Sequence, residues 1–465
     1  MFLRTRRIHF VGVGGIGMSG IAEVLCNLGY DVSGSDLRRS PTTDRLEGMG
    51  VTIFVGHEPE QVEGCHVVVR SSAVGASNPE VAHARDLGIP VIPRAEMLAE
   101  LMRMKHGVAV AGSHGKTTTT SLLAGIFDEG GLDPTIVVGG KLNSVDTNAV
   151  LGRGEWMVAE ADESDGSFLH LPPTIAIVTN IDPEHLDHYG TVEALHAAFL
   201  TFINKVPFFG AAVLCLDHPA IQALLPDVSK RYVTYGFTSQ ADFRATDVTI
   251  GDGCSSFGVL RGDEYLGPVT IQIPGRHNVL NSLAAIAASM EAGIPFTVIQ
   301  RALGRFQGVQ RRFTIRGLVQ GVTVVDDYAH HPAEIQATLG AARESYGRRI
   351  VAVWQPHRFS RVRDLRAEFM RSFNDCALLL VMDVYRAGEE PIEGVDGEAL
   401  VRDLRHHGHK AVLHTPDADA VLRVVQAEAR KGDVVITLGA GDITDLSHRI
   451  VDALDGFAPP TLEFD

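Results

Sequence analysis

A lysine and two threonines close a short glycine-containing segment of the 465-residue chain. The segment is Gly112-Ser113-His114-Gly115-Lys116-Thr117-Thr118, between an apolar run at residues 108–111 and a helix-length stretch at 117–127. Glycines let backbone amides approach phosphate oxygens, an ammonium neutralises the β- and γ-phosphates, and a threonine hydroxyl binds Mg²⁺. Two residues separate the glycines, where the general phosphate loop has four. The segment therefore predicts a nucleoside-triphosphate site in an atypical loop.

Carboxylates follow the next strongly apolar run, Trp156–Ala159. A strand that brings Glu160 beside the phosphate loop would place an acid where a nucleotide-bound Mg²⁺ is held. We expect Glu160 to bind this metal. For Asp162, Glu163 and Asp165, a solvated acidic turn fits at least as well as a metal role.

Polar residues also follow the predicted strand at residues 174–178, in the segment 179–188. The carboxyl end of a parallel strand is a favourable place for ligand-binding side chains. His185 in this segment could bind a second metal as neutral imidazole. A purely structural role for His185 fits its position equally well.

A second glycine-rich loop lies near the amino terminus, after a predicted strand at residues 8–13 and before a helix-like stretch at 18–28. It contains Gly14, Gly15, Ile16 and Gly17, and its backbone amides could hold a diphosphate at the helix N-terminus. Asp36 follows 19 residues after Gly17, where a Rossmann site places an acid on a ribose hydroxyl. A dinucleotide cofactor and tight strand–helix packing without a ligand both fit this loop.

The last third of the chain carries histidines and arginines after two further apolar runs. Asp327 and His330 follow residues 322–325, and the group His357, Arg358 and Arg361 follows residues 350–354. Arginine guanidinium groups bind phosphate or carboxylate through paired hydrogen bonds, so these residues favour an anionic ligand. Other basic residues nearby favour solvated surface over a metal cluster or a site: Arg363, Arg366, Arg371, His406, His407 and His409.

Strand-like runs alternate with helix-length segments throughout, which is typical of parallel α/β architecture. The pattern restarts near residues 106 and 311, and a length of 465 residues fits about three domains. We expect an amino-terminal Rossmann-like domain at 1–106, a central mononucleotide-binding sheet of the phosphate-loop type at 107–311, and a second Rossmann-like domain at 312–465.

Composition excludes several classes of protein. Lys plus Arg is 41 and Asp plus Glu is 57, and the net charge of −16 disfavours binding to a nucleic-acid polymer. Apolar runs are far shorter than the ~18 residues of a membrane span, and the five cysteines have no metal or disulfide spacing. We therefore expect a cytoplasmic protein that does not bind a membrane. Its oligomeric state cannot be predicted from these patterns.

The motifs taken together resemble one family, the Mur ligases. The resemblance spans almost the whole chain, through the segments 10–22, 112–120, 160–165, 275–281, 326–332, 355–358 and 439–443. The shortened phosphate loop is the form that this family uses. Arg70, before Ser71 and Ser72, departs from the apolar residue expected there, which leaves the uridine and diphosphate contacts undefined.

The resemblance implies an ATP-dependent reaction that joins L-alanine to the lactyl carboxylate of UDP-N-acetylmuramate, releasing ADP and phosphate, for peptidoglycan synthesis. It implies that the first domain holds the UDP-sugar and not NAD, that the central domain binds ATP with two Mg²⁺ ions, and that the third brings the amino acid. A relative that adds a whole peptide to the same sugar nucleotide is the nearest alternative. A nicotinamide dehydrogenase and a non-catalytic ATP switch are more distant ones.

The resemblance also implies roles for individual residues. Lys116 contacts the phosphates, Thr117 and Glu160 hold the first Mg²⁺, and His185 holds the second. Asn278 and Asn281 lie near the adenine, and Arg312 reaches the ATP phosphates. Asp327 and His330 serve the reacting groups. The UDP-sugar contacts are Gly14, Gly15, Ile16, Gly17, Asp36, Ser71, Ser72, His357, Arg358 and Arg361.

Overall fold

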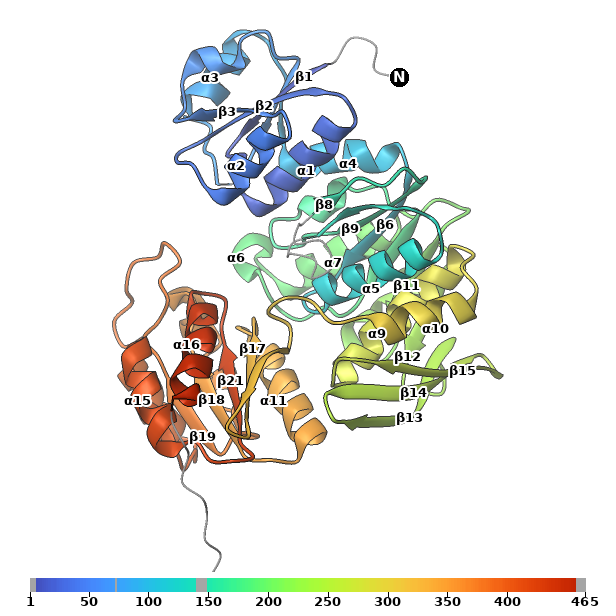
Figure 1. Ribbon diagram of the computed structural model, residues 1–465. Helices are drawn as coiled ribbons and strands as arrows, with labels where there is room; N and C mark the ends of the chain where they lie inside the picture. The colour runs from blue at the N-terminus through green and yellow to red at the C-terminus, as the bar shows by residue number, and fades with distance from the viewer. Residues whose placement is uncertain (1–5, 72, 139–148, 457–465) are drawn as a thin grey trace, which may run out of the picture. The chain divides into compact units, whose positions relative to one another are not determined.

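A computed structural model describes residues 6–71, 73–138 and 149–456. The described chain divides into two compact parts, residues up to 246 with 258–268 and 280–304, and residues 247–257 with 269–279 and those from 305 onward. Its strands form three sheets of mixed α/β architecture, which confirms the predicted fold class (Figure 1). The domain boundaries near residues 106 and 311 stay predictions.

The first sheet is parallel and five-stranded. Its order is β3 (Thr52–Val55), β2 (Asp31–Asp36), β1 (Arg7–Val11), β4 (Val67–Arg70) and β5 (Val91–Pro93). The helices that accompany it are α1 (Ile16–Asn27), α2 (Pro41–Gly48), α3 (Pro79–Asp86) and α4 (Arg94–Arg103). Figure 1 shows α1 and α2 on one side of this sheet and α3 on the other. The glycine-rich loop leaves the carboxyl end of β1, the central strand.

The second sheet has ten strands. Its order is β15 (Glu264–Ile271), β14 (Cys254–Arg261), β13 (Phe243–Gly251), β12 (Tyr232–Gly236), β11 (Ala211–Cys215), β10 (Ile175–Val178), β6 (His106–Ala111), β9 (Trp156–Glu160), β7 (Thr135–Val137) and β8 (Ala149–Val150). The strands from β7 to β12 in this order run parallel. Buried apolar side chains occupy β6, β10 and β11 almost throughout, as expected for parallel strands covered on both faces.

Helices α5 to α10 belong to the same region of the chain. They are α5 (Lys116–Glu129), α6 (Leu186–Tyr189), α7 (Val192–Ile203), α8 (Pro219–Leu224), α9 (Arg276–Glu291) and α10 (Phe296–Arg305). The phosphate loop connects β6 to α5, so the strand and the helix predicted on either side of it are confirmed.

The third sheet has six strands. Its order is β16 (Thr314–Val319), β17 (Val322–Asp327), β21 (Val434–Leu438), β18 (Ile350–Trp354), β19 (Leu378–Val381) and β20 (Val412–His414). Only β16, at the edge, is antiparallel to its neighbour. The helices of this region are α11 (Pro332–Tyr346), α12 (Phe359–Asp364), α13 (Arg366–Phe369), α14 (Gly397–His406), α15 (Ala418–Glu428) and α16 (Ile443–Asp455).

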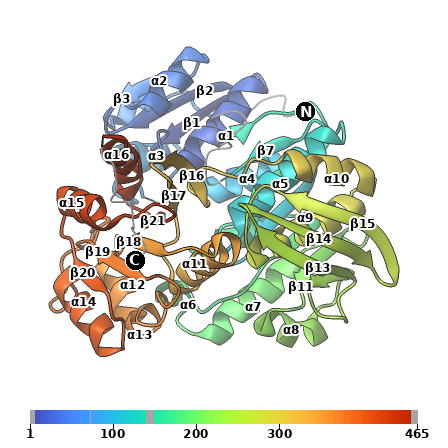
Figure 2. The ribbon, with the colours of Figure 1, turned by 60° about the horizontal axis from the view of Figure 1, so that its bottom comes forward.

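Helices cover both faces of this third sheet (Figure 2). Alternate residues of β18 point to opposite faces: Trp354 packs on the side of α11, α12 and α14, and Val353 on the side of α15 and α16. The Trp354 ring lies 4.9 Å and 4.8 Å from the rings of Phe369 and Phe373, measured between centroids. These two apolar layers fix the strands whose carboxyl ends carry the predicted arginines and histidines.

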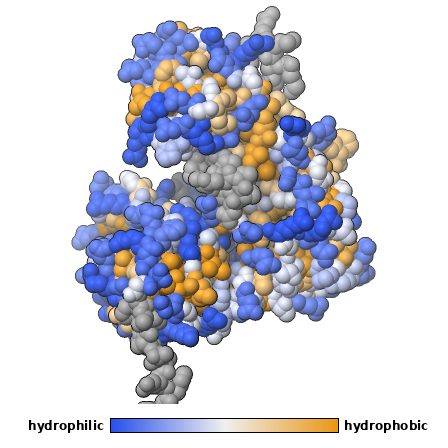
Figure 3. All heavy atoms as spheres, viewed as in Figure 1, coloured by the Kyte–Doolittle hydropathy of each residue, from blue (hydrophilic) through white to orange (hydrophobic). Residues whose placement is uncertain are grey.

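Hydrophilic side chains cover most of the face shown in Figure 3, and apolar ones gather in smaller groups. In the part of the chain that the structure describes, no helix is both long and apolar enough to cross a membrane. All five cysteines are free, which agrees with their scattered positions in the sequence.

Candidate active site

The phosphate loop lies against the residues that follow β10. Gly112 has φ +133°, and a Cβ at this position would stand 2.0 Å from the Thr179 hydroxyl oxygen and 3.1 Å from the backbone of Asn180. Gly115 has φ +83°, and its Cβ would stand 2.5 Å from the side-chain oxygen of Asn281. Both glycines are therefore required, by backbone conformation and by close approach.

Side chains of the same strand end hold the loop by hydrogen bonds. The His114 amide donates to Asn180 Oδ1 at 2.7 Å, and the Thr179 hydroxyl donates to the His114 carbonyl at 2.6 Å. The Asp182 amide donates to Ser113 Oγ at 2.8 Å. Thr179 and Asn180 thus support the loop, a role that the sequence did not assign to them individually.

Lys116 is the first residue of α5, and its ammonium faces the loop and an acidic residue. Nζ donates to the carbonyls of Gly112 at 2.6 Å and Ser113 at 3.2 Å, and to Glu163 Oε1 at 2.7 Å. Burial lowers the pKa of Lys116, but the carboxylates of Glu163, Asp162 and Glu160 outweigh burial and raise it above its ordinary value. The ammonium therefore stays charged.

The acidic cluster after β9 matches only in part the solvated turn that the sequence left as an alternative to a metal role. Asp165 is exposed, and the side chain of Asp162 is 46% exposed and lies 3.8 Å from Arg94. Glu163 corrects the prediction, because its side chain is only 2% exposed and is paired with Lys116. Burial raises the pKa of the Glu163 carboxyl, and Lys116 opposes this shift.

The predicted metal ligands lie next to the loop. Thr117 belongs to the first turn of α5, and Glu160 ends β9, where it pairs with Val110 of the strand that leads into the loop. A hydroxyl and a carboxylate oxygen are ligands that suit Mg²⁺. The donor set therefore fits this ion, although the roles of both residues stay predictions.

His185 stands close to two carboxylates. Its Nε2 atom lies 3.6 Å from Glu184 Oε2 and 3.9 Å from Glu163 Oε1, and its backbone has the left-handed φ of +56°. Such a conformation costs energy in a residue other than glycine and is commonly found at functional sites. Because Mg²⁺ prefers oxygen ligands, the carboxylates of Glu184 and Glu163 would supply oxygen ligands beside the His185 imidazole.

His114 joins the loop to the same carboxylate group. Its Nε2 lies 3.2 Å from Asp182 Oδ2 and 3.2 Å from Glu184 Oε1. Burial alone would raise the pKa of Asp182, but hydrogen bonds from His114 and His218 lower it well below its usual range. Imidazole groups therefore lie against the acidic side chains that follow β10.

The two asparagines implied by the family resemblance lie on α9. Asn281 is buried and stands beside Gly115, as the glycine geometry shows. Asn278 is buried one turn earlier, and its Nδ2 donates to the Pro274 carbonyl at 2.7 Å. Their predicted roles near adenine remain untested.

In the first sheet, Asp36 holds the glycine-rich loop itself. Its Oδ2 accepts a hydrogen bond from the Gly14 amide at 2.9 Å, and a Cβ at Gly14 would stand 2.8 Å from the same oxygen. One carboxylate oxygen of Asp36 is thus already hydrogen-bonded to the glycine-rich loop. The ribose contact predicted for Asp36 would be made beside this hydrogen bond. Gly15 caps α1, which Ile16 and Gly17 begin.

The loop after β4 borders the glycine-rich loop. A Cβ at Gly12 would stand 3.1 Å from Ser71 Cβ, so these two loops are in close contact. Arg70 donates to the Val74 carbonyl at 3.1 Å and so stabilises the loop that contains Ser71. Ser72, also predicted to bind the sugar nucleotide, lies outside the described residues.

A buried polar network beside this loop was missed by the sequence analysis. The Glu80 carboxylate is fully buried and bonds His9 at 3.0 Å, Ser35 at 2.6 Å and His57 at 2.7 Å. The Ser35 carbonyl accepts the amide of Gly12 at 2.9 Å, so the network is linked directly to the loop. Its members come from four separate segments, and no local pattern joins them.

In the third sheet, Asp327 organises the segments around it. Its Oδ2 accepts the Phe313 amide at 2.7 Å, and its Oδ1 accepts the Ala329 amide at 2.8 Å. Burial raises the pKa of Asp327 to about 6, against the opposing effect of Arg312. The carboxylate thus fixes the backbone on both sides of the site, next to Arg312 and His330.

Two arginines flank the Tyr328 ring. The guanidinium carbons of Arg311 and Arg312 lie 4.8 Å and 5.2 Å from its centroid. Arg311 also donates to the Gly439 carbonyl at 2.8 Å, and Arg312 lies 3.4 Å from Glu334 Oε1. Arg311 has a φ of +59°, so the chain turns sharply where it presents these cations.

The carboxyl ends of β17 and β18 bring two predicted histidines together. The rings of His330 and His357 lie 5.9 Å apart, and His357 stacks on Tyr385 at 5.5 Å. His330 Nδ1 lies 3.0 Å from the Tyr328 carbonyl, so this nitrogen carries the proton. His357 Nδ1 lies 3.2 Å from Arg361 Nη1, and because arginine only donates, the His357 proton sits on Nε2.

Burial and nearby charge keep both imidazoles neutral. Burial lowers the pKa of His330 to about 3, and burial together with Arg361 and Arg358 lowers that of His357 to about 4. Arg358 is exposed and has a φ of +67° at the start of α12. The site therefore presents cationic guanidinium groups with neutral imidazoles, an arrangement that suits an anion.

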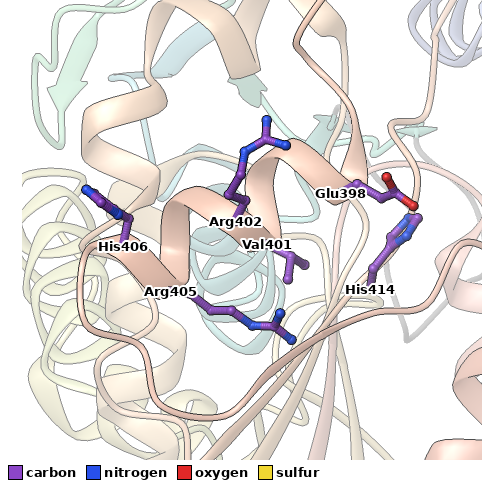
Figure 4. Close-up of a pocket in the computed structure, with 6 residues that line it drawn as sticks. All are labelled: Glu398, Val401, Arg402, Arg405, His406 and His414. Carbon is purple, nitrogen blue, oxygen red and sulfur yellow. The ribbon is translucent and has the colours of Figure 1, made fainter.

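A separate pocket of about 570 Å³ on α14 contains none of the predicted site residues. Its lining, shown in Figure 4, is Glu398, Val401, Arg402, Arg405, His406 and His414. His406 points away from the others, and His409 lies instead against Cys376 at 3.6 Å. His406 and His407 are exposed, as the sequence predicted, whereas His409 is partly buried, which corrects the prediction for this residue.

Comparison with known proteins covers most of the chain. Residues 7–106 match the family described as "Mur ligase family, catalytic domain", residues 110–289 the "Mur ligase middle domain", and residues 311–441 the "Mur ligase, glutamate ligase domain". The chain is similar to the UDP-N-acetylmuramate–L-alanine ligase of Anaeromyxobacter sp. strain Fw109-5, at 58% identity over 97% of this chain and 98% of the other. The Myxococcus xanthus protein of the same name is 56% identical over 96% and 95%.

Solved structures agree with this result. The UDP-N-acetylmuramate–alanine ligase of Thermotoga maritima has a TM-score of 0.79 and 29% identity, and the match covers 96% of this chain and 98% of that one. A murein peptide ligase from Psychrobacter arcticus shares the fold, with a TM-score of 0.67 and 24% identity over 97% and 99%. On the strength of the three matched segments and the full-length relatives, the chain belongs to the Mur ligase family.

Proposed function

We propose that this chain joins L-alanine to the lactyl carboxylate of UDP-N-acetylmuramate and converts ATP to ADP and phosphate. The partly buried Lys116 ammonium, at the end of a loop that requires glycine at positions 112 and 115, is the observation that carries the proposal. Relatives at 58% and 56% identity over nearly the full length are named for this reaction. The peptide-adding alternative is less well supported, since two solved peptide-adding relatives are only 24% and 28% identical to this chain.

The first step activates a poor acyl donor. A lactyl carboxylate oxygen attacks the γ-phosphorus of ATP, the bond to the β,γ-bridging oxygen breaks, and ADP leaves with that electron pair. Lys116 and the loop amides stabilise the charge on the phosphoryl group, and this kind of catalysis is mostly electrostatic. The product of the step is an acyl phosphate.

Membership of the family implies ATP and Mg²⁺. Thr117 and Glu160 would hold one ion, and His185 with its neighbouring carboxylates a second. Bound Mg²⁺ neutralises phosphate charge during transfer. The number of ions, like the role of each ligand, is part of the proposal.

The second step forms the amide. The neutral amine of alanine attacks the acyl carbon and a tetrahedral oxyanion forms. Phosphate then leaves with the electrons of the broken C–O bond and takes up the proton that the amine nitrogen loses. Arg312, Arg358 and Arg361 offer guanidinium groups to the anionic groups of the reactants, and His357 offers its Nε2–H. We assign Asp327 as the positioning residue that holds the backbone beside Arg312 and His330.

The other predicted contacts complete the proposal. Residues 1–106 would bind the UDP-sugar through the loop at Gly14–Gly17 with Asp36 and Ser71, residues 107–311 would bind ATP, and residues 312–465 would bring the amino acid. Asn278 and Asn281 would lie near adenine. Because the reaction consumes ATP, we place it in the cytoplasm.

Phosphate release tests this function. With ATP, Mg²⁺ and UDP-N-acetylmuramate, we expect sustained phosphate release on adding L-alanine, together with a product heavier by one alanine residue in mass spectrometry. Each amino acid and an L-alanine-containing tripeptide are assayed separately. Release with the tripeptide alone would support the peptide-adding alternative, and release without any acceptor would support an ATP switch.

Substitution of the loop lysine tests the proposed phosphate contact. In Lys116→Ala, kcat/KM for ATP should fall by a factor of about a hundred or more, because an electrostatic donor to the transition state contributes about 3 kcal/mol or more. Lys205→Ala removes an exposed cation from the same compact part and should leave kcat/KM unchanged. Near-normal turnover in the Lys116 variant would contradict the assignment.

The Asp327 carboxyl should titrate far from the ordinary value of 3.8. In protein labelled with ¹³C-aspartate, one carboxyl signal should titrate with a midpoint of about pH 6 and be absent from Asp327→Asn. Between about pH 4 and pH 6 the folded protein then holds a proton that the unfolded chain has released, so this group's contribution to the free energy of unfolding falls as pH rises. A midpoint at or below pH 4 would contradict the effect of burial.

A further inference from the structure

The ion pair between Lys116 and Glu163 leaves no free donor on the ammonium. A lysine has three N–H donors, and Nζ here contacts three oxygens: the Gly112 carbonyl, the Ser113 carbonyl and Glu163 Oε1. The side chains of Lys116 and Glu163 are 19% and 2% exposed. A phosphate oxygen can therefore bind this lysine only if one of these partners is given up.

Glu163 is the partner that competes by charge. The two carbonyls belong to the loop and move with it, whereas Glu163 lies 47 residues along the chain, after β9. Its carboxylate carries the kind of charge that a nucleotide phosphate brings to the same ammonium. Phosphate and Glu163 are therefore alternative counter-ions for Lys116.

The surroundings of the Glu163 carboxylate indicate what such an exchange would require. Oε2 is buried and has no hydrogen-bond partner among the described residues, and Oε1 lies 3.9 Å from His185 Nε2. The Tyr189 hydroxyl donates to the Glu163 carbonyl and so anchors its backbone, not its carboxylate. A buried carboxylate that loses its lysine needs another cation, because an unpaired buried charge is costly.

We propose that Glu163 is the counter-ion that holds Lys116 while the nucleotide site is empty, gives the ammonium up to the phosphates when nucleotide binds, and then takes Mg²⁺ as its new cation. The inference rests on the proposed function, because it needs a nucleotide at the loop. Glu163 is thus a positioning residue that makes nucleotide affinity depend on Mg²⁺. Without Mg²⁺, the wild-type carboxylate opposes nucleotide binding.

Calorimetric binding of ADP to the full chain tests this exchange, once with EDTA and once with Mg²⁺. Glu163→Gln keeps the shape of the side chain and removes its charge. Its Mg²⁺-free ADP affinity should rise about tenfold over wild type, the scale of one charged hydrogen bond. The factor by which Mg²⁺ improves ADP binding should shrink by about tenfold or more. A purely structural Glu163 would instead lower affinity in both conditions.

Asp165→Asn is the matched control. It removes the same charge two residues away, from an exposed side chain that accepts a hydrogen bond from the Ser167 amide, and an asparagine oxygen can also accept this bond. Both ADP affinities should stay within about twofold of wild type, since exposed charges are screened by solvent. Glu163→Asp keeps the charge on a shorter side chain, and its Mg²⁺-free affinity should lie between those of wild type and Glu163→Gln.

Equal or weaker Mg²⁺-free ADP binding in Glu163→Gln would overturn the inference, as would an equal rise in Asp165→Asn. If Glu163→Gln does not fold, as judged by circular dichroism, Glu163→Asp takes its place. Mg²⁺-free ADP affinity above that of wild type then supports the inference, and equal or lower affinity overturns it. Wild type that binds no ADP would overturn the inference and the nucleotide site together. Wild type that binds ADP as expected but releases no phosphate with alanine would contradict only the proposed substrates.

Discussion

The site of the central sheet depends on the close approach of the phosphate loop to the end of β10. With Gly112 packed against the Thr179 hydroxyl and the Asn180 backbone, the loop has no space for a side chain at this point. The same contacts turn the Gly112 and Ser113 carbonyls toward Lys116, which fixes the ammonium at the start of α5. One backbone contact thus sets the position of a charge, and that charge sets the positions of the acids around it.

The same geometric rule builds all three groups of candidate residues. The glycine-rich loop, Asp36 and Ser71 follow or end β1, β2 and β4, which are neighbours in the first sheet. The phosphate loop, Glu160 and Asn180 come from the adjacent strands β6, β9 and β10. His330 and His357 follow β17 and β18, on either side of β21. Parallel strands place their carboxyl ends along one edge, so residues distant in sequence meet there.

Charge in these groups is balanced locally, and the net charge of −16 does not describe them. In the central sheet, acids lie against Lys116, His114 and His185. In the third sheet, Arg311 and Arg312 share the ring of Tyr328, and burial keeps His330 and His357 neutral. The acids of the central sheet suit a cation and the guanidinium groups of the third sheet suit an anion, which fits the proposed reaction of Mg²⁺-bound ATP with anionic substrates.

The sequence predicted the parts of the site that follow local rules. The strand–loop–helix around Lys116 is confirmed, because apolar periodicity and glycine spacing are local properties. The sequence could not show which acid of the run 162–165 points inward, since Asp162 and Glu163 are adjacent and only Lys116 distinguishes them. Glu80 and Asp327 were harder still: Glu80 bonds His9 across 71 residues, and the contacts of Asp327 are to backbone amides.

Transfer of oxygen from the sugar nucleotide to phosphate tests the central claim most directly. UDP-N-acetylmuramate carrying ¹⁸O in both lactyl carboxylate oxygens is converted with ATP and L-alanine, and the phosphate is analysed by mass spectrometry. Activation as an acyl phosphate predicts one ¹⁸O atom in each phosphate and the other in the new amide. Phosphate free of ¹⁸O, formed together with the amide, would contradict the proposed mechanism.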